Sequence, residues 1–249
     1  RDPRELAGAW RRFQRYTSAS PSPDLAPYVA RYWMVSWRYA EPYRQLIVPN
    51  PAVHLTFQNG RATVRGVWRG HQFKVLTGTD RVFGVAFRPA GFRPFLGAPV
   101  ATITDRTIDA REVFHGDPPD PVDVPTVEDF LRAQRPEPDA KAEWADAIVA
   151  RIAADPRVTR VGDLAHDLGM SVRSLQRLFA EYVGVGPKWV IRRYRLHEVS
   201  QRLARGEPVD WAELAAELGY ADQPHFVRDF RRMFGEPPSR YAERYERSA

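Results

Sequence analysis

Residues 217–235 read ELGYADQPHFVRDFRRMFG, and this stretch decides how the second half of the chain folds. Phe226, Phe230 and Phe234 recur every four positions, which places them along one face of an α-helix. That face must be buried against other helices. The side chains on the opposite face are His225, Arg228 and Arg232. The stretch therefore predicts an amphipathic helix near 223–234 that displays cationic groups.

The same pattern occurs earlier, so this half of the chain contains an internal repeat. VGDLAHDLGMSVRSLQRLFAEYVGVGPKWV (161–190) aligns with WAELAAELGYADQPHFVRDFRRMFGEPPSRY (211–241). In each copy a Leu-Ala pair precedes a Gly, which ends a short helix by adopting a left-handed conformation. A capping residue, Ser171 in the first copy and Asp222 or Gln223 in the second, then opens another helix. This order predicts two helix-turn-helix units.

The outward side chains of the second helix in each copy indicate a binding role. In the first copy they are Arg173, Gln176 and Arg177. Arg and Gln can each bond two atoms of a guanine or adenine edge, and such a pair gives about 1–3 kcal/mol of discrimination. We expect Arg231 and Arg232 to meet phosphates instead. His225 either touches DNA or caps its own helix.

The segments around these units are also predicted to be helical. Residues 187–205 predict one long helix that holds the two units apart, and adjacent major-groove segments lie about 34 Å apart. A further helix begins after the cap Asp139 and buries Trp144, Ile148 and Ile152. We expect the acidic residues Glu181 and Asp229 to pair with nearby Arg side chains.

Residues 28–108 predict a different structure, made of short strands. YVARYWMVSWRY, RQLIV, VHLTF, TVRGVW, HQFKVL and VFGVAF are rich in β-branched and aromatic residues and are bounded by Pro, Asn and Gly. Asn59-Gly60 predicts a two-residue hairpin turn. Two helical pieces are expected near 109–114 and 126–132, and AQRPEPDAK (133–141) is typical of an interdomain linker.

Composition removes several classes of protein. The chain has no Cys, which excludes disulfides, thiolate metal sites and thiol nucleophiles. The net charge of +6 suits a polyanionic partner, but residues 139–249 hold 18 basic against 17 acidic residues. The DNA interpretation therefore depends on where particular cations lie. With no long apolar run and no signal-like start, we expect a soluble, cytoplasmic protein without a membrane partner.

The repeat resembles the double helix-turn-helix of AraC/XylS transcriptional regulators. The resemblance is carried by DLAHDLGMSVRSLQRLFAEYVGVGP (163–187), RRYRL (192–196) and LAAELGYADQPHFVRDFRRMFGEPPSRY (214–241). It implies seven helices whose third and sixth enter successive major grooves of promoter DNA. The DNA-binding residues it implies are Ser171, Arg173, Ser174, Gln176, Arg177, Asp222, Gln223, Pro224, His225, Arg228 and Arg232. Pro224 departs from the hydroxyl or amide residue common there, which weakens base reading at that position.

The first half is similar, less specifically, to the cupin-like sensor domains that precede this unit in many family members. Such a domain implies a small apolar or aromatic ligand, or dimerisation through a filled barrel. The candidate ligand-binding residues are Trp33, Trp37, Arg38, His54, Trp68 and Arg88. His54, His71 and His115, even with Asp80 and Glu112, lack the spacing of a metal site, so we expect no metal, no cofactor and no enzyme.

The sequence thus predicts a two-domain α+β protein. Residues 1–135 form a β-barrel or sandwich that regulates or dimerises, and residues 139–249 form an all-α domain with recognition helices near 172–183 and 223–234. The predicted function is sequence-specific transcription regulation, with RNA polymerase as a partner if the protein activates and a homodimer as an alternative assembly. A DNA-binding architectural protein without sequence choice is the alternative. The ligand, the operator and the direction of regulation are not encoded in these patterns.

Overall fold

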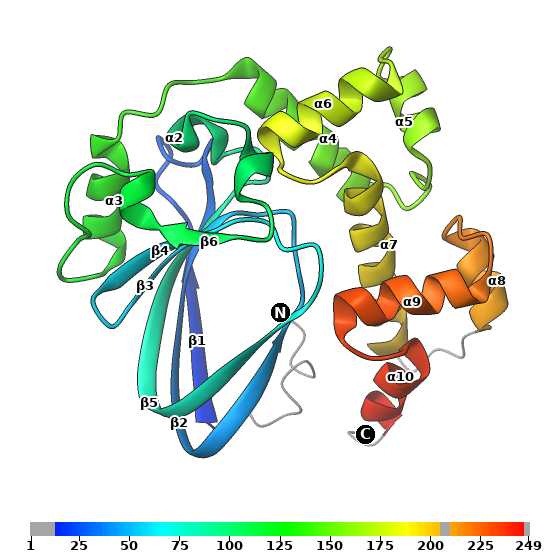
Figure 1. Ribbon diagram of the computed structural model, residues 1–249, viewed down its shortest axis with the longest axis horizontal. Coiled ribbons are helices and arrows are strands. Elements are labelled where there is room, and N and C mark those ends of the chain that lie inside the picture. Colours follow the sequence, from blue (N-terminus) through cyan, green and yellow to red (C-terminus); the bar gives the residue numbers. More distant parts are fainter. Residues whose placement is uncertain (1–12, 205–209, 247–249) are drawn as a thin grey trace.

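The structure is a computed structural model that describes residues 13–204 and 210–246. A β-sheet lies on one side and a group of helices on the other, and the long helix α7 runs beside the sheet (Figure 1). Strands occur up to residue 109 and the described residues beyond 123 contain helices but no strand. The predicted α+β architecture, with a β-rich first part and an all-α second part, is therefore confirmed.

The sheet is antiparallel and open. Its strand order is β1-β2-β5-β3-β4-β6, and the edge strands β1 and β6 pair with one neighbour each in the described part of the chain. It is consequently not a closed barrel. The strands are β1 (Gln14–Ala19), β2 (Val29–Ile47), β3 (His54–Gln58), β4 (Arg61–Arg65), β5 (Gln72–Phe87) and β6 (Thr107–Asp109).

Strand lengths differ from the prediction, whereas one turn agrees with it. Asn59 and Gly60 have φ angles of 52° and 71° and join β3 to β4, as a two-residue hairpin turn requires. Two pairs of predicted strands are each one continuous strand, β2 and β5. A register shift between Tyr39 and Tyr43 absorbs the irregularity in β2, so the polar residues there do not end the strand.

One face of the sheet is buried by short helices. Leu55 and Val64 are fully buried and belong to the same core as Val127 and Leu131 of α3. The core also includes Phe179 of the helical part, so it runs without interruption from the sheet into the first helix-turn-helix unit. The covering helices are α2 (Arg93–Leu96), η2 (Val100–Ile103), η3 (Ala110–Glu112) and α3 (Val124–Ala133).

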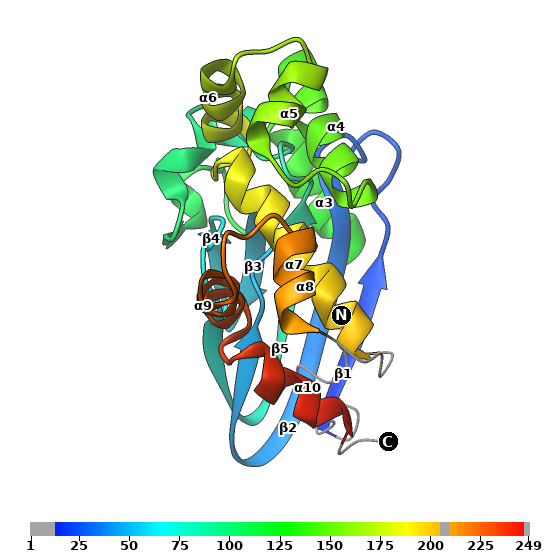
Figure 2. The ribbon, with the colours of Figure 1, turned by 90° about the vertical axis from the view of Figure 1, so that its right-hand side faces the viewer.

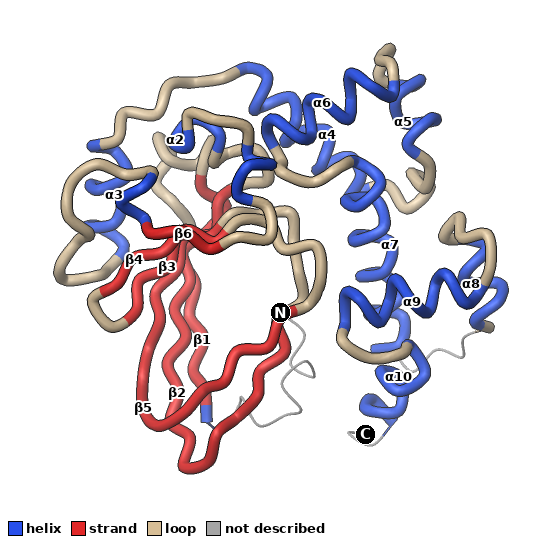
Figure 3. The backbone as a smooth tube through the Cα atoms, viewed as in Figure 1, coloured by secondary structure: helices blue, strands red, loops and turns tan. Residues whose placement is uncertain are grey.

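The second half has the predicted order of helices. They are drawn in blue at the right of Figure 3. Their bounds are α4 (Ala140–Ala154), α5 (Val161–Asp167), α6 (Val172–Tyr182), α7 (Pro187–Ala204), α8 (Trp211–Glu217), α9 (Gln223–Phe234) and α10 (Pro238–Glu246). We call α5 with α6 the first unit and α8 with α9 the second unit. An 18-residue α7 is about 27 Å long and separates them.

The local signals of each unit are confirmed. Gly169 and Gly219 have φ angles of 63° and 74° and end α5 and α8 in the left-handed region. The apolar row of α9 is buried: Phe226 and Phe230 are 0% exposed, and Phe234 is 1% exposed. The second unit thus has its own core, which also contains residues of α7 and α10.

One expectation about α4 is wrong. Asp139 caps this helix as predicted, because its carboxylate accepts from the backbone N–H groups of Lys141 and Ala142. Trp144, however, is 41% exposed. The buried face is rotated toward smaller side chains, Ala145 and Val149, which let α4 lie close against α6 and α7. No helix among the described residues is long and apolar enough to cross a bilayer.

Phe230→Ala should destabilise the second unit. Truncating a fully buried Phe costs about 3–5 kcal/mol, and Phe230 contacts both Phe234 and Tyr241. Chemical denaturation followed by circular dichroism and by hydrogen exchange of α9 measures the loss. The neighbouring exposed Arg231→Ala should change stability by less than about 0.5 kcal/mol. Equal stability of the two variants would contradict the proposed core.

Candidate nucleic-acid interface

The outward row of α6 is free of intramolecular partners. Arg173, Gln176 and Arg177 are exposed and make no side-chain hydrogen bond or ion pair with the described residues. Ser171 and Ser174 are engaged in the helix cap: the backbone N–H of Ser174 donates to Oγ of Ser171 at 3.1 Å, and their hydroxyls lie 2.8 Å apart. The first unit therefore displays two guanidinium groups and one amide to solvent.

On α9, the side chain of Arg228 makes no hydrogen bond or ion pair with the described residues, whereas residues at the two ends of the helix form hydrogen bonds within the fold. Gln223, Pro224 and Arg228 are exposed. The carboxylate of Asp222 accepts from the backbone N–H of His225 at 2.7 Å, so Asp222 is the N-cap. The side chain of Arg232 is exposed, while its carbonyl accepts from the sheet part, as described below.

His225 does not cap its own helix. Its ring lies edge-on to Tyr220 at 5.6 Å, and the Arg192 guanidinium donates to its Nε2 at 3.5 Å. The expectation that His225 serves as a cap is wrong, because Asp222 already fills that role. His225 is half-buried, which leaves part of its ring available beside Arg228.

The two helices that carry the displayed rows, α6 and α9, lie on the same side of α7. Figure 1 shows α6 and α9 running in similar directions at different heights along α7. In the view turned by 90°, both helices are seen close to end-on and on the same side of α7 (Figure 2). The structure therefore places α6 and α9 on one side of the molecule.

Arginine side chains of α7 hold the second row in position. The sequence alone predicts only that this helix holds the two units apart. Arg192 forms an ion pair with Asp229 of α9 at 2.8 Å, and its guanidinium lies 5.4 Å from the centre of the Tyr220 ring. The expected pairing of Asp229 is confirmed. Burial, with the nearby Asp229 carboxylate, raises the pKa of Tyr220. The RRYRL motif could have indicated this role, since it places guanidinium groups on two faces of α7.

The first unit is tied to the sheet part. Glu181 of α6 pairs with Arg93 of α2 at 2.7 Å, so its partner lies in the other half of the chain. The hydroxyl of Thr104 donates to the carbonyl of Gly184 at 2.5 Å. These contacts leave the outward row of α6 uncovered.

The candidate ligand residues do not form one group. Trp33, His54 and Trp37 share one face of the sheet, and Trp33 Nε1 donates to His54 Nδ1 at 3.3 Å. Burial, with the nearby Arg65 and Arg31 guanidinium groups, lowers the pKa of His54 to about 3, so this ring is neutral. Trp68 lies nearby, because the Arg65 guanidinium is 5.7 Å from the centre of its ring.

Arg38 and Arg88 lie elsewhere. Arg38 is exposed on β2, and Arg88 forms an ion pair with Asp146 of α4, so it joins the two halves of the chain. Among the described residues, no three His, Asp or Glu side chains come together as a metal site requires. His71 donates to a carbonyl of α9, and His115 is exposed on a loop.

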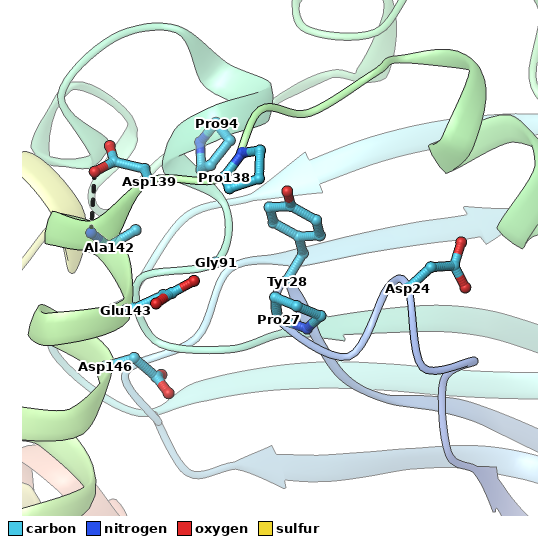
Figure 4. A pocket seen from close by; sticks show the side chains of 10 residues that line it. All are labelled: Asp24, Pro27, Tyr28, Gly91, Pro94, Pro138, Asp139, Ala142, Glu143 and Asp146. Atoms are coloured by element: carbon cyan, nitrogen blue, oxygen red, sulfur yellow. Dashed lines mark hydrogen bonds between the residues drawn. The ribbon is translucent and has the colours of Figure 1, made fainter.

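A small pocket opens where the sheet part meets α4 (Figure 4). Its volume is about 170 Å³, below the roughly 300 Å³ typical of ligand pockets. Most of its carboxylates have partners: Asp24 pairs with Arg132, Asp139 caps α4, and Asp146 pairs with Arg88. The pocket is therefore a seam between the halves and not a ligand site.

The fold and the exposed rows together define a double helix-turn-helix protein with a β-sheet domain attached. Comparison with known proteins agrees. A family model described as "Helix-turn-helix domain" matches residues 164–244, and a "Domain of unknown function (DUF6597)" matches residues 17–109. The first of these matches spans both helix-turn-helix units, from within α5 to α10.

The curated relatives match about a third of this chain. The regulator ExsA of Pseudomonas aeruginosa is 29% identical over 82 residues, which is 32% of this chain and 29% of that protein. The regulator GlxA of Rhizobium meliloti is 35% identical over 75 residues, 30% and 23% of the two chains. The activator RhaS of Pectobacterium atrosepticum is 30% identical over 77 residues, 31% and 27% of the two. The chain thus spans less than a third of these relatives.

Solved structures with a related arrangement are distant. A transcriptional regulator with an AraC-type DNA-binding domain from Chromobacterium violaceum is 23% identical, with a TM-score of 0.38 over 45% of this chain and all of that one. ToxT from Vibrio cholerae is 10% identical, with a TM-score of 0.37 over 93% and 98%. Likenesses at this level carry no argument about function.

Asp222→Ala should lower stability through the lost cap. Removing an N-cap side chain costs about 0.5–2 kcal/mol, and the carboxylate of Asp222 accepts from the first turn of α9. Thermal unfolding of the full chain measures the change. Asp222→Ser keeps a capping oxygen and should lose much less. A variant series in which Ala and Ser behave alike would show that the cap does not stabilise α9.

Proposed function

We propose that the chain is a sequence-specific transcription regulator that places α6 and α9 in successive major grooves of promoter DNA. The observation that carries the proposal is that α6 and α9 lie on one side of α7 and that each carries an uncovered row of polar side chains. Arg173, Gln176 and Arg177 on α6 and Arg228 on α9 have no internal partner in the described chain, so their hydrogen-bond donors remain available. Such donors suit base edges.

The roles within the rows differ. Arg177, Gln176 and Arg228 lie centrally on the exposed faces and are the base-reading candidates. Three side chains take part in helix caps, and we assign them to positioning the helix ends: Ser171, Ser174 and Asp222. Arg231 and Arg232 lie in the last turn of α9 and suit phosphate contacts.

We assign regulation to residues 1–135 and DNA binding to residues 139–249. The interaction partners we propose are promoter DNA, a small ligand or a second copy acting through the sheet part, and RNA polymerase if the protein activates. No catalytic constellation is proposed for the sheet, since its His side chains serve hydrogen bonds within the fold.

Arg177→Ala and Arg228→Ala should each weaken specific DNA binding by about 1–3 kcal/mol, because each removes a two-atom contact to a base. The measurement is a fluorescence-anisotropy titration of the full chain at fixed salt. The DNA is first selected by the wild-type chain from a random-sequence library. The fold should be retained, since both side chains are exposed.

Lys141→Ala is the matched control. It removes one exposed positive charge from α4, away from both rows, and should change affinity little. Equal losses in all three variants, with affinity governed by salt alone and no sequence enriched from the library, would identify an architectural DNA-binding protein instead.

A further inference from the structure

The face of the sheet opposite the main core gathers groups that donate hydrogen bonds. His54 of β3 and Arg65 of β4 are direct register partners. Their neighbours Leu55 and Val64 point into the core, so His54 and Arg65 point to the other face. The hydroxyls of Thr56 and Thr63, the next pair along this face, lie 2.9 Å apart.

Lys74 of β5 lies on the same face of the sheet, away from Arg65. Its ammonium donates to Oε1 of Gln58 at 2.8 Å and lies 5.8 Å from the centre of the Trp37 ring. Gln58 follows Thr56 on the same side of β3, because alternate residues share a face. A polar strip therefore runs from Arg65 to Lys74, with aromatic rings beside both ends.

Among residues 13–204 and 210–246, no carboxylate pairs with Arg65. Its guanidinium forms no ion pair and no hydrogen bond with the described residues, although it is half-buried over the Trp68 ring. Trp68 Nε1 is buried and also has no hydrogen-bond partner in the described chain. Asp80, the carboxylate nearest Lys74, is held by Gln58 at 2.7 Å and by Asn59 at 3.1 Å. Neighbouring donors without an acceptor suit an anionic ligand.

The electrostatics agree with this geometry. Burial lowers the pKa of Arg65, and burial together with the nearby Arg65 lowers the pKa of Lys74. The lowered pKa values of both groups indicate cations that are removed from water and have too little negative charge nearby. A bound anion would reverse that cost.

We propose that this face binds a small monocarboxylate with an apolar or aromatic body, and that Arg65 anchors the carboxylate. A guanidinium can donate two parallel hydrogen bonds to a carboxylate, and the Trp68 N–H is a further donor close by. The half-buried ring of Trp33, on the same face, is positioned to contact the apolar body. The inference deepens the proposed regulatory role and rests on it.

The loops beside this face connect it to the DNA-binding half. Asn50 Oδ1 lies 3.4 Å from Nε2 of His54, and the adjacent Pro49 carbonyl accepts from Arg193 of α7. On the other loop, the Arg69 carbonyl, next to Trp68, accepts from Trp189 Nε1 of α7 at 3.1 Å.

The second loop also reaches α9. The backbone N–H and Nδ1 of His71 both donate to the Arg232 carbonyl, at 3.0 and 2.9 Å. An anion that orders Trp68 and His54 would therefore act on the loops that hold the spacer and the second recognition helix. We expect it to change DNA affinity.

Titration of the full chain, followed by tryptophan fluorescence, tests the site. The probes are benzoate, phenylacetate and octanoate, each compared with its neutral amide. The acids should bind saturably and at least tenfold more tightly than the amides. Arg65→Met should raise the dissociation constant at least tenfold, whereas Arg38→Met, which removes an exposed guanidinium from the same sheet, should change it less than twofold.

Arg65→Met should fold, because the substitution removes an unpaired, half-buried cation; its melting temperature should equal or exceed that of the wild type. Arg65→Lys, which keeps the charge and loses the fork, should bind with intermediate affinity. Failure of every acid to exceed its amide, or equal losses for Arg65→Met and Arg38→Met, would overturn the site.

The selected DNA separates this inference from the proposed function. A chain that binds no specific DNA with or without acid overturns the function, whatever the fluorescence shows. A chain that binds DNA specifically but ignores every acid overturns the site alone. Acid binding that leaves DNA affinity unchanged would overturn the coupling through the two loops.

Discussion

The buried guanidinium of Arg195 is the contact on which the arrangement of the helices depends. Arg195 of α7 is 1% exposed and donates to the carbonyls of Ile152 and Asp155 at 2.5 and 2.6 Å. The last carbonyls of α4 have no partner within their own helix, and a cation there also offsets the helix dipole. Glu198 supplies the counter-charge at 3.1 Å. Burial lowers the pKa of Arg195, and the nearby Glu198 carboxylate opposes that shift. The spacer is thereby fixed to the frame of the first unit.

Arg192, on the same helix α7, positions the second unit. Two guanidinium groups of α7 therefore determine how the two recognition helices lie relative to each other. Arg195 contacts α4 on one side of α7, and Arg192 contacts Asp229 of α9 on another. The units repeat in sequence, but they are held differently. The first shares the core of the sheet part, whereas the second has a separate core, against which Val48 of the sheet part packs, and it also accepts hydrogen bonds from His71.

Local patterns predicted the helical half well because its signals are local. The Phe row of α9, the caps Ser171 and Asp222, and the hairpin at Asn59-Gly60 each depend on residues within one turn or one helix. Contacts between distant segments could not be predicted in the same way. Arg88, expected beside a ligand, pairs with Asp146 of α4, and Trp144 is exposed because smaller residues form the buried face. That Arg65 and Lys74 lie on the same face of the sheet can be recognised only from the strand register.

The sheet part contacts both units. Arg93 and Thr104 contact the first unit through Glu181 and Gly184, while His71 contacts the end of α9. Successive major grooves have a fixed separation, so a small displacement of either recognition helix costs contacts in the other. The loop that carries His71 begins beside Trp68. Under the regulation proposed above, a change in charge balance at Arg65 would act on the loop through which His71 contacts α9, and so on the spacing of the two rows.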